Sequence, residues 1–285
     1  MDEYEIKPEN IYNMDEKGFL IGVLPKSKRV FSRRAYECEG IKQRMQGSTR
    51  EWIITNACIC ADNTSLSPAL IYQAASGNLQ DTWLQDLDAG SHRCFVTSPS
   101  GWTNNGLGLA WLRDIFDRET KGKARRDRRL LFLDGHGSHV TMEFLNYCEQ
   151  SKILAMTYPP HSTHTLQPLD VGIFSPLSRA YGDELEAFLH TSLGLSAVTK
   201  KEIFRFFWPS WEKASSPKKI ESSWRSVGLW PLDPEVVLAK FNRRSDESPS
   251  PSEPSQSPLE ADDWRNIVRL VEEVSSDVNG ENTKN

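Results

Sequence analysis

The stretch LLFLDGHGSH, residues 130–139, sets four apolar residues directly before Asp134 and two nearby glycines. A short continuous apolar run of this kind is typical of a strand buried on both faces, so residues 129–133 are predicted to form one. The glycines that follow let the backbone turn sharply and leave room for a substrate. Because the carboxyl ends of parallel strands are the usual site in such a sheet, Asp134 stands where chemistry is expected.

Outward from this strand, the hydrophobic pattern changes between strand and helix periods. Strands are predicted over residues 12–23, 50–61 and 67–73, with Gly18 and Gly22 as turn points in the first. Helical spacing covers residues 104–118, with Thr103 as N-cap, and then 141–150 and 174–189, with a strand over 153–158 between the last two. This order predicts an α/β protein with a mixed sheet, built from an antiparallel meander and parallel crossovers, with flanking helices.

The predicted organisation has five parts. A domain over residues 8–195 is followed by a basic, Trp-rich helical extension over 196–244. Residues 245–259 are mostly Ser, Pro and Glu, which predicts a disordered linker. An acidic amphipathic helix is predicted over 260–276, and a disordered tail over 277–285.

Composition argues against several classes of protein. The 285 residues are 38% hydrophobic and 26% charged, and no apolar run approaches the roughly 20 residues that cross a bilayer. The N-terminus is acidic and lacks the apolar segment of a secretory signal. Five cysteines without a C-x-x-C pair, two of them alternating as Cys58 and Cys60, favour reduced, buried thiols and an intracellular protein.

The net charge of −5 conceals an uneven distribution. Residues 245–285 hold ten acidic and three basic side chains, so the first 244 residues carry a net charge of +2. Basic residues gather at 26–34 and 121–129, and residues 200–244 hold ten basic against five acidic side chains. These clusters permit a phosphate-backbone partner, although each taken alone is also typical of a solvated loop or helix face.

Asp15 and Asp170 also lie within apolar sequence. A buried carboxylate persists only if it is hydrogen-bonded, paired or bound to a metal. Asp170 follows Asp134 by 36 positions, after one helix and one strand, and Asp15 can face Asp134 if its strand is central. Three convergent carboxylates would form an oxygen-rich site suited to Mg²⁺ or Mn²⁺ and to in-line displacement at phosphorus. The alternative for each aspartate alone is a cap or turn residue.

Four histidines offer a competing metal site. They form two H-x-x-H pairs in Gly- or Pro-rich loops, namely His136 with His139 and His161 with His164. A mixed His/Asp zinc site is one reading, but neither pair has a helical frame. We interpret these histidines, with Lys17, as substrate-binding residues that contact phosphate or the scissile region. The chain has no Gly-rich phosphate loop, nucleophile elbow or dinucleotide fingerprint.

In combination, four segments resemble the DDE superfamily endonuclease domain of pogo-type transposases, in the mariner superfamily, and fungal copies above all. The segments are YNMDEKGF (12–19), LFLDGHGSH (131–139), YPPHSTHTLQPLD (158–170) and SWRSVGLWPLDP (223–234). The resemblance covers roughly residues 8–240 and implies a ribonuclease-H-like fold, with Asp15, Asp134 and Asp170 as the catalytic and metal-binding triad. It also implies Mg²⁺ as cofactor, with Mn²⁺ able to substitute, DNA as partner, and the nucleus as location. The N-terminal helix-turn-helix domains of full-length relatives are missing from this sequence.

Two functions follow as hypotheses. The first is a metal-dependent DNA endonuclease and strand transferase of the transposase type. The second is a non-catalytic, domesticated or truncated nuclear module that binds DNA or protein. Neither involves a membrane or a small-molecule substrate, and a homodimer is left open.

Deleting residues 245–285 is expected to leave catalysis intact and to leave DNA affinity unchanged or slightly higher, because an acidic segment competes with phosphate for a basic surface. Affinities of the intact and truncated proteins for a DNA duplex at low salt measure this. A clear loss of affinity on truncation would show that the acidic tail assists binding.

Overall fold

The computed structural model describes residues 6–21, 52–80, 83, 94–135, 141–159, 162–191 and 198–239. All of them lie in the first of two compact units, Met1–Phe241. The second unit, Asn242–Asn285, lies outside the described residues, and so do the linker, acidic helix and tail that the sequence predicts there.

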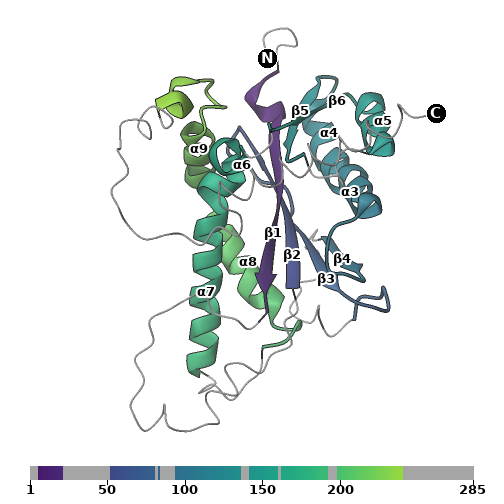
Figure 1. Cartoon of the computed structure of the whole chain (residues 1–285), viewed down its shortest axis with the longest axis vertical. Helices are drawn as coiled ribbons and strands as arrows, with labels where there is room; N and C mark the ends of the chain where they lie inside the picture. The colour runs from purple at the N-terminus through teal and green to yellow at the C-terminus, as the bar shows by residue number, and fades with distance from the viewer. Residues whose placement is uncertain are drawn as a thin grey trace, which may run out of the picture. The chain divides into compact units, whose positions relative to one another are not determined.

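Six strands form one mixed sheet in the order β4-β3-β2-β1-β5-β6 (Figure 1). Their bounds are Ile11–Leu20 (β1), Trp52–Cys60 (β2), Ala69–Gln73 (β3), Cys94–Ser98 (β4), Arg129–Leu133 (β5) and Ile153–Thr157 (β6). β1, β2 and β3 pair antiparallel, whereas β5 and β6 run parallel to β1. The predicted α/β class is confirmed: an antiparallel meander joined to parallel crossovers, with β1 central, as a ribonuclease-H-like fold requires.

Two details of the strand prediction are wrong. Gly18 is no turn point, because it pairs with Ile54 inside β1. A Cβ on Gly18 would lie 3.1 Å from the Trp52 ring, so the glycine makes room for the indole of the neighbouring strand. The short strand β4, which pairs in parallel with β3, was not predicted at all. Gly22 lies outside the described residues.

The helical elements precede, separate and follow the parallel strands. Before β5 come the 3-10 turn Pro8–Asn10 (η2) and a continuous run made of α3 (Asn105–Trp111), a π-helical turn η4 (Leu112–Asp117) and α4 (Arg118–Ala124). After it come α5 (Met142–Gln150), α6 (Thr163–Leu166), a second π-helical turn η6 (Leu169–Ile173), α7 (Phe174–Thr191), α8 (Ile203–Ala214) and α9 (Pro217–Ser226). Asn104, not the predicted Thr103, caps α3, since its Oδ1 accepts a hydrogen bond from the Leu107 N–H at 3.0 Å.

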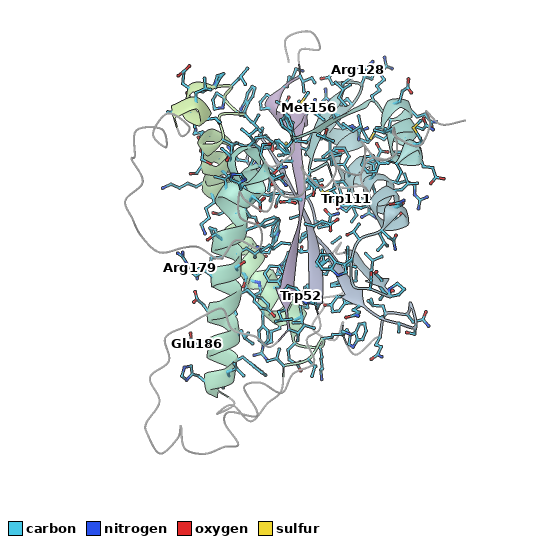
Figure 2. The ribbon with its side chains drawn as sticks, viewed as in Figure 1. Trp52, Trp111, Arg128, Met156, Arg179 and Glu186 are labelled. Atoms are coloured by element: carbon cyan, nitrogen blue, oxygen red, sulfur yellow. The ribbon has the colours of Figure 1, made fainter. Side chains whose placement is uncertain are left out.

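Alternate residues of β1 divide the core into two layers, as the period of a strand dictates. Ile11 and Phe19 pack in the layer formed with α7, α8 and α9, whereas Tyr12 and Met14 pack in the layer formed with α3, η4 and α5. In Figure 2, Trp111 belongs to the second layer, while Arg179 and Glu186 project from α7. The Trp-rich residues 203–224 therefore complete the core over one face of the sheet.

A buried ion pair fastens the π-helical turn η4 to β5. Arg129 is only 3% exposed, and its Nη2 lies 2.7 Å from Asp117 Oδ1. Its Nη1 also donates to Thr120 Oγ1 at 2.9 Å. Loss of one partner would leave a buried charge unpaired, which is strongly destabilising. Arg129 is therefore a structural member of the basic cluster 121–129.

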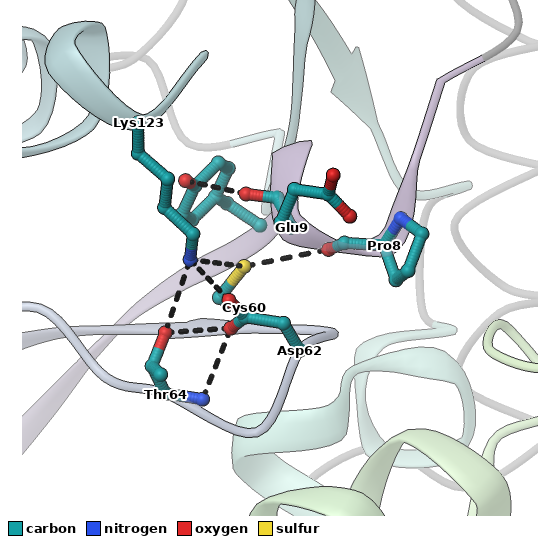
Figure 3. A network of polar contacts seen from close by, with 7 residues as sticks. Pro8, Glu9, Cys60, Asp62, Thr64 and Lys123 are labelled. Atoms are coloured by element: carbon teal, nitrogen blue, oxygen red, sulfur yellow. Dashed lines mark hydrogen bonds and ion pairs between the residues drawn. The ribbon is translucent and has the colours of Figure 1, made fainter.

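Lys123, in the same cluster, closes a second polar network (Figure 3). Its Nζ pairs with the Asp62 carboxylate and donates to Thr64 Oγ1 at 3.3 Å and to Cys60 Sγ at 3.7 Å. The Cys60 thiol in turn donates to the Pro8 carbonyl at 3.4 Å. The network ties α4 to the turn after β2 and to the start of β1, so this lysine too has structural partners.

Cys58, Cys60 and Cys148 are free and buried, as predicted for the thiols. Burial raises the pKa of the Cys60 and Cys148 thiols to about 12, so both stay protonated at neutral pH. Among the described helices, none combines the length and the apolarity needed to cross a bilayer.

Helix α9 docks closely on the turn η6. A Cβ added to Gly172 would lie 2.3 Å from Ser223 Cβ and 2.9 Å from Ser223 Cα, so only glycine permits this approach. Trp224, the next residue of α9, is fully buried with its ring centroid 6.4 Å from that of Phe132 on β5. Thus α9 contacts both segments that lead to Asp134 and Asp170.

Gly172→Ala is expected to destabilise the protein by about 1–3 kcal/mol, because the added methyl group forces the backbones of η6 and α9 apart. Chemical denaturation of the variant and the parent protein measures this. Gly122→Ala is the control: nothing lies within 4 Å of that Cβ, and in helix α4 the change should stabilise by about 0.5–1 kcal/mol. Equal effects of the two substitutions would contradict the close packing of α9 on η6.

Candidate functional site

Asp15 lies on β1, and Asp134 directly follows the neighbouring parallel strand β5. The register of β1 and β5 pairs Ile11 with Leu130 and Asn13 with Phe132. Continued by two residues, it sets Asp15 beside Asp134, just past the end of β5. Partners in register project from the same face of a sheet, so the two carboxylates share the face that η6 and α7 cover.

Asp170 comes from the π-helical turn η6, directly before α7. The sequence predicted Asp170 at or just before the start of this helix, and it lies about one helical turn before Phe174, the first residue of α7. Asp15 is buried, Asp134 is partly exposed and Asp170 is exposed, so the site runs from the sheet interior out to solvent. A large substrate could therefore reach the outer carboxylates without any rearrangement of the core.

The three carboxylates are close enough to change one another's ionisation. Burial raises the pKa of Asp15 well above its ordinary value, and the negative charges of Asp170 and Asp134 raise it further. A hydrogen bond from the Glu16 N–H to Asp15 Oδ1, at 2.7 Å, opposes this by stabilising the ionised form. Asp134 and Asp170 therefore lie near enough to Asp15 to act on its pKa, and the role of the three as a metal-binding triad stays a prediction.

Two basic side chains accompany Asp170. Partial burial raises the pKa of Asp170 and Asp134 adds to this, while the positive charges of Lys17 and His164 lower it. Lys17 follows Asp15 by two positions on β1 and so shares its face, and its Nζ lies 5.7 Å from the centre of the Phe174 ring at the start of α7. Lys17 thus supplies a cation beside the acidic site.

Of the predicted histidines, the structure brings His164 to the site. It lies on the short helix α6 and is exposed, near enough to Asp170 to act on its pKa. His136, His139 and His161 lie outside the described residues.

Sequence reasoning missed three buried polar residues around Asp15. Asn13 and Gln167 are 0% exposed, and Tyr158 is 7% exposed. Gln167 lies near enough to lower the pKa of Asp15, although its amide makes no hydrogen bond of standard geometry. Burial, followed by the charge of Asp15, raises the pKa of Tyr158. Asn13 could have been found from its spacing, since it is two residues before Asp15 on a predicted strand.

The donor set suits a hard divalent cation. All three acidic side chains offer oxygen ligands, and a cation would offset the mutual repulsion that raises the pKa of Asp15. Within the described parts of the chain, no group of three or more His, Cys, Asp or Glu side chains is placed so that it could hold a metal ion.

The mixed sheet and the carboxylate-rich site beside its parallel strands agree with the endonuclease fold that the sequence resemblance implies. The chain belongs to the family described as DDE superfamily endonuclease, which matches residues 49–224. Asp134 and Asp170 lie inside the matched range, and Asp15 precedes it.

Other similarities were found beyond the family match. A Cochliobolus lunatus protein named MFS-type transporter clz9 is 35% identical over 242 residues, which is 85% of this chain. The chain spans about a quarter of that relative, since the match covers 25% of its length. Among solved structures, the Mos1 strand transfer complex is 14% identical with a TM-score of 0.46, covering 81% of this chain and 55% of that one. The catalytic domain of Mos1 mariner transposase is 13% identical with a TM-score of 0.37, covering 77% and 83%.

Asp15→Asn is expected to stabilise the metal-free protein at pH 7 by about 1–2 kcal/mol, as often happens when a strained functional group is removed. Because the folded-state pKa of Asp15 is raised, the folded protein binds this proton more tightly than the unfolded chain. The resulting stability is present at low pH and is lost as pH rises through the folded-state pKa. The amide keeps an oxygen for the Glu16 N–H and carries no charge, so the decline with pH should flatten.

Urea unfolding in the presence of a chelator, between pH 5 and pH 8, measures this. Asp127→Asn is the control, since that exposed carboxylate pairs with the exposed Lys7 at 3.4 Å and its loss should change stability by less than about 0.5 kcal/mol. A lower stability of Asp15→Asn at pH 7 would contradict the assignment of a repelled, buried carboxylate.

Proposed function

We propose that this chain is a metal-dependent DNA endonuclease and strand transferase of the pogo type. The observation that carries the proposal is the convergence of Asp15, Asp134 and Asp170 from three separate segments of a DDE superfamily chain. The pogo assignment rests on the four sequence segments around these residues and around α9. DNA is the proposed partner and the nucleus the proposed location.

Asp15, Asp134 and Asp170 would hold Mg²⁺, with Mn²⁺ able to substitute. When bound, the metal would activate a water or a DNA 3′-hydroxyl as nucleophile and neutralise charge for in-line displacement at phosphorus. The buried Asp15 would be a ligand oriented by the Glu16 N–H. The exposed Asp170 would be a ligand on the solvent side.

Lys17 and His164 are the proposed substrate-binding residues in the described region. Both lie near enough to Asp170 to lower its pKa. The positive charge of Lys17 would attract the DNA backbone, whose affinity for proteins depends on such contacts. We propose the same role for His136, His139 and His161.

A non-catalytic binding module is the alternative function. It is favoured by one observation: the described carboxylates are not assembled as a metal-ligand set. In that case the basic residues would bind DNA or a protein partner while the aspartates remain without a catalytic role. Such a domesticated chain would need only the fold and its surface charge.

Nicking of supercoiled plasmid in the presence of Mn²⁺ discriminates the two functions. We expect cleavage by the wild-type chain, supported poorly by Zn²⁺, and a loss of at least about a hundredfold in Asp134→Asn, because metal stabilisation of the transition state amounts to several kcal/mol. Asp233→Asn, an exposed aspartate after α9, is the matched control and should cleave normally. Cleavage that persists in Asp134→Asn would point to another site or a contaminant, and absence of cleavage with retained DNA binding would favour the module.

A further inference from the structure

Asn13 is a fully buried polar residue in the middle of the sheet. It is 0% exposed, lies on β1 two positions before Asp15, and therefore projects from the same face. A buried amide is costly unless its donors and acceptor are used. Its partners therefore indicate what it contributes.

The Asn13 side chain makes hydrogen bonds to two other segments. Its Oδ1 accepts from the Leu169 N–H at 3.1 Å, which is a bond between residues 156 positions apart. Its Nδ2 donates to the Phe132 carbonyl at 3.5 Å and to the Met14 carbonyl at 3.4 Å. The bond to Leu169 is the shorter and the one that reaches out of the sheet.

Each of these partners lies within two positions of a residue of the triad. Leu169 directly precedes Asp170, Phe132 precedes Asp134 by two positions, and Asn13 itself precedes Asp15 by two. We infer that Asn13 is the positioning residue of the acidic site: its one amide sets β1, β5 and η6 at the distance at which their three carboxylates converge. This inference depends on the function proposed above only in the second measurement below, which uses metal binding.

The same contacts could also serve stability alone. Asn56 separates the two possibilities, because it is a similarly buried asparagine, 2% exposed, on β2. It pairs with Glu16, whose side chain projects from the face opposite Asp15. Asn56→Leu therefore reproduces the replacement of a buried amide by an apolar group without touching the acidic site.

The first measurement is hydrogen exchange of the Leu169 amide, compared at equal distance below the melting temperature of each variant. In Asn13→Leu this N–H loses its acceptor, and we expect exchange at least about fivefold faster, as loss of one hydrogen bond predicts. Asn13→Asp keeps an acceptor oxygen and should retain the protection. Asn56→Leu should retain it as well. This readout needs neither metal nor activity.

The second measurement is Mn²⁺ affinity by calorimetry on the full chain. Asn13→Leu should bind Mn²⁺ about 10–100-fold more weakly, the usual effect of losing a group that orients metal ligands. Asn56→Leu should bind like the wild type. Unchanged Leu169 protection in Asn13→Leu, or an equal loss of affinity in Asn56→Leu, would overturn the assignment. A wild-type chain that binds no Mn²⁺ would instead overturn the proposed function, while hydrogen exchange would still decide the role of Asn13.

Discussion

Repulsion between carboxylates is the constraint on which the rest of this structure depends. Burial raises the pKa of Asp15 and of Asp170, and nearby negative charge raises both further: that of Asp170 and Asp134 acts on Asp15, and that of Asp134 acts on Asp170. Left to themselves, three such groups would move apart. Asp15 lies on β1, Asp134 directly follows β5, which pairs in parallel with β1 as far as Asn13 and Phe132, and Asp170 lies on η6.

The surrounding residues counter this repulsion in different ways. The Glu16 N–H stabilises the charge of Asp15, while Lys17 and His164 stabilise that of Asp170. Close packing also fixes the position of η6, because Gly172 lets η6 approach Ser223 on α9 closely. The Trp-rich segment, which the sequence predicted as a helical extension, thus packs against η6 and β5 beside the site.

Elements with a strong local pattern could be predicted from the sequence. The apolar run at 129–133 gave β5 at its observed bounds, and the period-2 runs gave the meander. The three aspartates were predicted as site residues because a buried carboxylate within apolar sequence must be hydrogen-bonded, paired or bound to a metal. β4 escaped prediction because its five residues carry little alternation, and because its place beside β3 depends on pairing that no local signal records.

Long-range contacts explain the other failures. Gly18 resembled a turn residue, but the Trp52 ring on the next strand decides its role. Arg129 and Lys123 resembled part of a DNA-binding cluster, yet Asp117 and Asp62 hold them within the protein. The spacing of Asn13 places it on the same face as Asp15, but the hydrogen bond from the Leu169 amide, 156 residues away, is visible only in the structure.

The docking of α9 on η6 also has a consequence for the nascent chain. Ser223 follows Asp170 by 53 residues, so all three aspartates leave the ribosome well before the helix that supports the last of them. Chains are made at about 5–20 residues per second, which leaves an interval of seconds in which the sheet can form while η6 has no backing. The support of η6 by α9 is therefore completed only after the three aspartates and the strands of the sheet have been synthesised.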